Sequence, residues 1–180
     1  MMMPDGLPIP ASEPSNQAQK SFLSADADEG LRYTRILVPI DFSEHSRKST
    51  SYAMRFASLY NATLLLVHVF ELPGYALTGD EYVKPSSELL KSHAHAHEQA
   101  ARANLTMIEN QVRNRGVKVE AHHCVGCAFD EIVKIAKQLD ADLIIIGSHG
   151  RTGLQHLLLG SVAERVVEHA RCPVLVVKHV

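Results

Sequence analysis

The feature that most constrains the fold of this chain is a repeated alternation between short aliphatic runs and longer segments of helical pattern. Nearly every residue is aliphatic in the runs at 36–40, 63–69, 143–146 and 173–177, and a further strand is expected at 117–125. Strands that are buried on both faces have this composition, and they belong to parallel sheets covered by helices on both sides. The alternation therefore predicts an α/β fold built on a doubly wound, five-stranded parallel sheet.

The segments between the runs carry apolar residues at helical spacing. Ser43 is a suitable N-cap for the first helix, and a long helix is expected from about 86 to 115. Two shorter helices are expected, one at 128–139 and one that Ser161 would cap. The stretch at 71–84 contains proline and glycine residues, and it is predicted to be a loop that can cover a site.

Composition limits the number of domains and the classes of partner. The chain has 180 residues, of which 46% are apolar, and this suits one domain at 32–180. Residues 1–31 carry four prolines among polar residues and are predicted to be a disordered tail. A net charge of −2 argues against nucleic acid and anionic membrane as partners. Without a secretory signal or an apolar span, and with three cysteines, the protein is expected to be cytoplasmic.

A candidate site follows from the fold, because ligands of doubly wound sheets bind at the carboxyl ends of the strands. These ends carry Asp41, Val69 and the glycine-rich stretch from Gly147 to Ser161. Glycines let the backbone approach a polyanion and adopt positive φ, and the N-terminus of the following helix favours phosphate. The motifs G-x-x-x-x-G-K-[ST] and G-x-G-x-x-G are absent. On the residues alone, the stretch can be a phosphate site or only a set of turns.

The spacing within this stretch closely resembles the ATP-binding motif of the universal stress protein family. It reads Gly147, two residues, Gly150, nine residues, then Gly160 and Ser161. The resemblance covers about residues 33–180, and it extends to the segments 36–41, 68–69 and 173–177. It implies a flavodoxin-like domain, of the adenine nucleotide alpha hydrolase-like type, that binds ATP.

The resemblance also implies roles for nine residues. Pro39 and Asp41 would line the adenosine, with the Asp41 carboxylate accepting hydrogen bonds from ribose hydroxyls, and Val69 would meet the adenine through its backbone. Ile146 would pack beneath the nucleoside. The phosphates would be surrounded by Gly147, Gly150, Gly160, Ser161 and Val162. Mg²⁺ or Mn²⁺ would arrive with the phosphates, and a homodimer would form through the C-terminal strand at 173–178.

The preferred interpretation is a nucleotide-dependent sensor or switch in the stress response, with an adenine nucleotide as its ligand. Hydrolysis calls for a positioned carboxylate or glutamine together with Lys, Arg and Mg²⁺. No such set is evident in the sequence, although His149 and His156 could act as bases. No catalytic residue is therefore assigned, and slow ATP hydrolysis at most is expected.

Two alternatives stay open. The first is an oligomeric stress scaffold or chaperone that does not need nucleotide. The second is a thiol redox protein using Cys124 and Cys127, a C-x-x-C at the end of a strand, where the dipole of the next helix would lower a thiol pKa. Zinc binding by these cysteines with His122 and His123 has less support, because one short segment rarely supplies four tetrahedral ligands.

Overall fold

The structure is a computed structural model, and it describes residues 32–71, 88–150 and 159–178. The predicted tail at 1–31 and nearly all of the predicted loop at 71–84 lie outside these residues. Among the described helices, none is long and apolar enough to cross a membrane.

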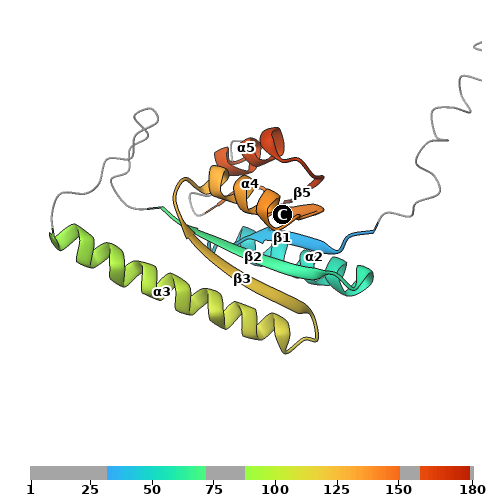
Figure 1. The fold of residues 1–180 in the computed structure, drawn as a ribbon, viewed down its shortest axis with the longest axis horizontal. Coiled ribbons are helices and arrows are strands. Elements are labelled where there is room, and N and C mark those ends of the chain that lie inside the picture. The colour runs from blue at the N-terminus through green and yellow to red at the C-terminus, as the bar shows by residue number, and fades with distance from the viewer. Residues whose placement is uncertain (1–31, 72–87, 151–158, 179–180) are drawn as a thin grey trace, which may run out of the picture. The chain divides into compact units, whose positions relative to one another are not determined.

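Five parallel strands form one sheet in the order β3-β2-β1-β4-β5 (Figure 1). The strands are β1 (Arg35–Pro39), β2 (Thr63–Phe70), β3 (Lys118–Val125), β4 (Leu143–Gly147) and β5 (Val174–Val177). Every residue of β4 is buried, which explains its uninterrupted aliphatic sequence. The strand order confirms the predicted doubly wound α/β fold. It puts the switch point between β1 and β4, and sheets of this kind bind ligands beyond the carboxyl ends of such strands.

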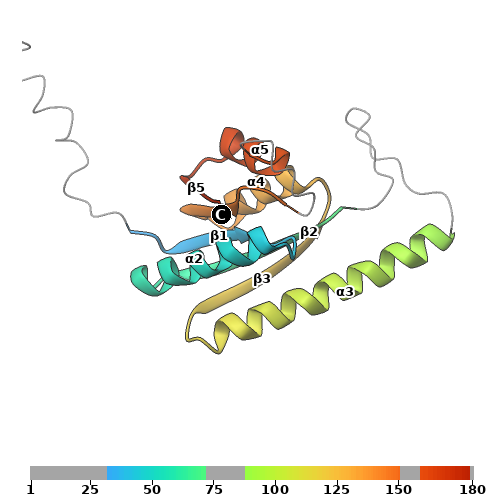
Figure 2. The same cartoon turned by 180° about the vertical axis from the view of Figure 1, so that it is seen from behind.

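The described helices cover both faces of the sheet (Figures 1 and 2). One face packs against α2 (Glu44–Tyr60) and α3 (Glu88–Arg113), and the other face packs against α4 (Ala128–Gln138) and α5 (Ser161–His169). Successive strand residues point to opposite faces. Ile36 and Val38 therefore pack in the core beneath α2 and α3, whereas Leu37 packs in the core beneath α4 and α5.

Two helix starts at the carboxyl edge of the sheet test the capping predictions. Ser43 caps α2 as expected, since its hydroxyl oxygen accepts a hydrogen bond from the Ser46 amide at 3.2 Å. The prediction that Ser161 caps the last helix is wrong. The chain enters α5 in an extended conformation at Gly160, with φ −72° and ψ 152°, and Ser161 is already the first helical residue. Residue preferences alone do not resolve a shift of one position.

Candidate functional site

A cavity of about 260 Å³ lies at the carboxyl ends of β1, β2 and β4. All nine residues predicted to bind nucleotide line it, namely Pro39, Asp41, Val69, Ile146, Gly147, Gly150, Gly160, Ser161 and Val162. Parallel strands end at one edge of the sheet, and this brings together residues that are far apart in the sequence. Their part in binding stays a prediction. Arg151, Gly153 and His156 lie outside the described residues.

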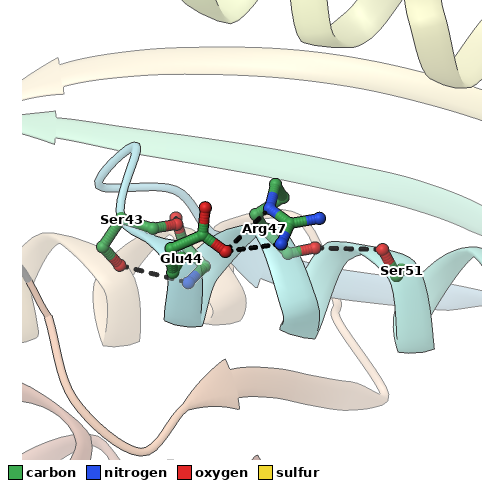
Figure 3. Close-up of polar contacts among 5 residues, drawn as sticks. Ser43, Glu44, Arg47 and Ser51 are labelled. Carbon is green, nitrogen blue, oxygen red and sulfur yellow. Dashed lines mark hydrogen bonds and ion pairs between the residues drawn. The ribbon is translucent and has the colours of Figure 1, made fainter. Parts of the chain in front are cut away.

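A second cavity, of about 330 Å³, lies between α2 and α3, so size alone does not identify the site. Its lining includes Arg47, but the guanidinium of this residue forms an ion pair with Glu44 (Figure 3). The carbonyl of Arg47 also accepts a hydrogen bond from Ser51 Oγ at 3.1 Å. The first cavity is the better candidate, because it lies at the strand ends and combines a carboxylate with glycine backbone and a helix N-terminus.

Asp41 reaches the cavity from the turn between β1 and α2. Its Oδ1 accepts hydrogen bonds from the Ser43 amide at 3.0 Å and from Ser43 Oγ at 2.6 Å. Its Oδ2 lies beside Gly150, at 2.8 Å from the position that a Cβ on that residue would occupy. One carboxylate oxygen is thus held by the local turn, and the other meets the glycine-rich segment after β4.

The glycines at this edge are needed for close approach. A Cβ on Gly147 would lie 2.9 Å from the Cβ of His45 and 3.0 Å from its carbonyl carbon, whereas a Cβ on Gly160 would have 3.4 Å to its nearest neighbour. The expectation that the site glycines have positive φ is wrong for Gly147, Gly150 and Gly160. Of the glycines in the described residues, only Gly116 has positive φ, at 78°. A Cβ on Gly147 would therefore force the His45 backbone to shift and one on Gly150 would force the Asp41 carboxylate to turn away, while Gly160 has room for a Cβ.

The N-terminus of α5 contributes backbone groups to the cavity. Gly160 is the N-cap and has no side chain that could bond the first amides. Its own amide donates to the Ser148 carbonyl at 2.7 Å, which ties the start of α5 to the end of β4. Ser161, Val162 and Ala163 then line the cavity as the first turn. Amides in a first helical turn carry partial positive charge and attract anions.

His149 also lines this cavity. Nδ1 of His149 lies 3.1 Å from Ser148 Oγ, and its ring centroid lies 5.5 Å from that of His45. The described lining contains no lysine or arginine.

Two further histidines lie side by side on the face beneath α3. His68 of β2 is buried, and its ring centroid lies 5.6 Å from that of His123 on β3. Neither ring nitrogen of His123 has a hydrogen-bond partner among the described residues. Burial lowers the pKa of His123, and the positive charge of Arg102 lowers it further. The neutral form of His123 is therefore favoured at this position.

The two cysteines of the C-x-x-C lie at the junction of β3 and α4, where Cys127 is the N-cap residue of α4. Cys124 lies near the end of β3, and its Sγ lies 3.6 Å from the carbonyl oxygen of His68. Burial, with the charge of Glu131, raises the pKa of Cys124 to about 11. The expectation of a lowered pKa is wrong for this thiol, because it is enclosed in the strand layer instead of exposed at the helix end. Among the described residues, no three His, Cys, Asp or Glu side chains are grouped for a metal ion.

Comparison with known proteins identifies the family. The sequence pattern of the universal stress protein family matches residues 32–178. This chain belongs to that family. Universal stress protein MJ0531 of Methanocaldococcus jannaschii is 37% identical to it over 147 residues, which make up 81% of this chain and 82% of the relative.

Solved structures of universal stress proteins share the fold. That of MJ0577, also from Methanocaldococcus jannaschii, has a TM-score of 0.72 and 33% identity, and the match covers 83% of this chain and 99% of that chain. The universal stress protein from Archaeoglobus fulgidus in complex with dAMP has a TM-score of 0.52 and 24% identity, with 81% and 98% covered. At the latter identity, the likeness shows the fold alone.

Sequence reasoning missed several residues that border the cavity of this universal stress protein. His68 and Glu71 come from the end of β2, and Ala128 and Ile132 come from α4. The rule that strand ends form the site could have indicated Glu71, which directly follows β2. The sequence offered no such signal for the α4 residues, because their approach depends on how that helix packs on the sheet.

Proposed function

We propose that this universal stress protein binds ATP in the cavity at the carboxyl edge of its sheet and acts as a nucleotide-dependent switch in the stress response. One observation carries the proposal. Nine residues predicted from a motif and from strand ends converge on a single cavity, although they come from three separate parts of the chain. The parallel sheet brings these strand ends together, and the support for binding is that they place a carboxylate, bare glycine backbone and a helix N-terminus around one cavity.

The described residues fit the three parts of an adenine nucleotide. Val69 and Ile146 provide apolar walls for a base. The Asp41 carboxylate is an acceptor, which suits the hydroxyl donors of a ribose. Gly150 and the first turn of α5 offer backbone to the phosphates, and the lack of a Cβ at Gly150 leaves room beside Asp41. Mg²⁺ or Mn²⁺ would enter on the phosphate oxygens.

A protein of this fold has been solved with dAMP. The likeness to that protein shows a shared fold alone. The nucleotide proposed for this chain is therefore inferred from the residues of this chain. ATP is proposed as the nucleotide because the spacing of Gly147, Gly150, Gly160 and Ser161 resembles the ATP-binding motif of the family.

The proposal is tested by release and titration of nucleotide. The purified protein is denatured, and the supernatant is chromatographed for adenine nucleotides. ATP with Mg²⁺ is then titrated while Tm is followed, with GTP as the control. A ligand that binds only the folded state stabilises it by about 2.7 kcal/mol at 100 times its dissociation constant. Absence of released nucleotide together with an unchanged Tm at millimolar ATP would overturn the proposal.

We also propose a homodimer formed through the segment 173–178. β5 lies at one edge of the sheet and pairs only with β4 in the described fold. An edge strand presents unpaired backbone groups, and pairing with a second copy is one way to satisfy them. Sedimentation equilibrium of the protein and of a Val176→Pro variant tests this, since the bonds of Pro173 and Val177 to β4 leave the Val176 amide facing the free edge, and proline removes that donor. A monomeric wild-type protein would contradict the dimer.

A further inference from the structure

His68 touches the residue before Asp41. It is 5% exposed and belongs to β2, next to the turn that joins β1 to α2. Its Nδ1 lies 2.6 Å from the carbonyl oxygen of Ile40. A carbonyl oxygen only accepts hydrogen bonds, so Nδ1 carries a proton and donates it. His68 therefore holds the carbonyl of Ile40 at the start of the Asp41 turn, while the Ile40 amide donates to the Val67 carbonyl at 2.8 Å.

His68 also touches the residue after Asp41. Phe42 has φ 66°, in the left-handed region that bulky residues seldom occupy. Its ring packs on the imidazole of His68 with 4.6 Å between the centroids. Such a backbone conformation persists where the surrounding contacts enforce it, and it occurs most often at functional sites. Here the imidazole supplies one of those contacts, although the Phe42 side chain is 39% exposed.

These two contacts place one buried side chain on both sides of the carboxylate proposed to bind ribose. We infer that His68 is the positioning residue for Asp41: it holds Ile40 by a hydrogen bond and Phe42 by ring packing, and thereby gives the site its preference for ribonucleotides over deoxyribonucleotides. The inference rests on the proposed function. His68 itself does not need to contact the nucleotide for this role, because it acts through the direction of the Asp41 carboxylate.

A role limited to core packing makes a different prediction. Loss of a packing residue would destabilise the protein and weaken ATP and 2′-deoxy-ATP binding by the same factor. Loss of a positioning residue would weaken ATP more, because only ATP offers the 2′-hydroxyl to Asp41. The ratio of the two dissociation constants therefore separates the two roles, and stability alone does not.

The test measures dissociation constants for ATP and 2′-deoxy-ATP by calorimetry at one pH. A hydrogen bond to a charged group accounts for a preference of about tenfold or more, and wild type is expected to show it. His68→Leu is expected to reduce this ratio to that of Asp41→Ala. His68→Asn, whose amide nitrogen can replace Nδ1 as a donor, is expected to restore most of it. An unchanged ratio in His68→Leu would overturn the inference.

Two further variants keep the test decisive. His123→Leu changes the neighbouring histidine, which contacts His68 but not the Asp41 turn, and it is expected to leave the ratio unchanged. If His68→Leu does not fold, Phe42→Gly gives the answer. Glycine accepts the left-handed backbone and lacks the ring, so a lower ratio supports the inference and an unchanged ratio overturns it. If wild type binds neither nucleotide, the proposed function itself fails.

Discussion

Two helices, α4 and α5, begin at the same edge of the sheet, and their first amides meet different partners. The amide of Ala128 in α4 donates to Glu71 Oε1 at 3.0 Å, so the protein supplies its own anion there. Among the described residues, the N-cap of α5, Gly160, has no side chain to bond the first amides, and the first turn of this helix lines the cavity. Amides at a helix start favour negative charge. The start of α4 therefore receives an anion from Glu71, whereas the first turn of α5, which carries Glu164, faces the cavity in which we propose that phosphate binds.

The segments that lead into α4 and α5 also differ in the residues that they bring to the edge of the sheet. Glycines lead into α5, and one of them brings the backbone against Asp41. Cysteines lead into α4, and Cys124 is enclosed beside the His68 carbonyl. We propose that the strand end before α5 receives the ligand for two reasons: the first turn of this helix faces the cavity, and the glycines leave the backbone there without side chains. Both conditions can be changed by single substitutions.

The largest effect is expected from Gly150→Ala. The new Cβ would lie 2.8 Å from Asp41 Oδ2 and displace the carboxylate from the site. The stabilisation by ATP, about 2.7 kcal/mol at 100 times the dissociation constant, is expected to be mostly lost. Gly126→Ala is the matched control, because Gly126 does not line the cavity and its new Cβ would meet only the Glu131 side chain. Thermal unfolding with and without ATP measures both, and equal losses in the two variants would contradict the assignment.

The sheet and the members of the site could be predicted from the sequence. Strands that are buried on both faces consist almost entirely of aliphatic residues, as at 143–146. The spacing of Gly147, Gly150 and Gly160 can likewise be recognised in the local sequence. How these residues contact one another could not be predicted in this way. The reason for glycine at position 150 is the nearness of Asp41, which is a property of the folded chain.

The contacts that brace the site are also invisible in local sequence. His68 bonds a carbonyl 28 residues away, and Glu71 bonds an amide 57 residues away. The pKa of Cys124 follows from its burial, and burial is decided by packing between layers. A motif therefore predicts which residues meet, whereas long-range packing decides how they are held and charged.

A second large effect concerns the thiol of Cys124 in β3. With a pKa of about 11, Cys124 is expected to have a thiolate fraction of about 10⁻⁴ at pH 7, roughly a hundredfold below that of an ordinary thiol. Alkylation by iodoacetamide in a Cys127→Ser, Cys172→Ser background should be at least that much slower than for N-acetylcysteine. The rate should keep rising tenfold per pH unit to pH 9.5. A plateau near pH 8 would restore the redox alternative.

A smaller effect is expected from alanine substitutions of two glycines at strand ends, Gly147 at the end of β4 and Gly126 after β3. In Gly147→Ala the new Cβ meets the backbone of His45 at about 3.0 Å, so α2 must shift. Overpacking of this kind costs about 1–3 kcal/mol. In Gly126→Ala the nearest atoms belong to the Glu131 side chain, which can turn away, and the expected change is within about 0.5 kcal/mol. Urea unfolding compares the two, and equal costs would show that the α5 junction is no tighter than the α4 junction.

The smallest effect is expected from Glu71→Gln, which keeps an acceptor for the Ala128 amide and removes its charge. Charge at a helix start is worth about 0.3–1 kcal/mol when exposed to solvent, and urea unfolding should show a loss of this size that shrinks at high salt. Glu168→Gln is the control, because this exposed carboxylate lies near the C-terminus of α5, where removing negative charge is neutral or stabilising. A loss in Glu168→Gln equal to that in Glu71→Gln would mean that α4 gains nothing from its internal anion.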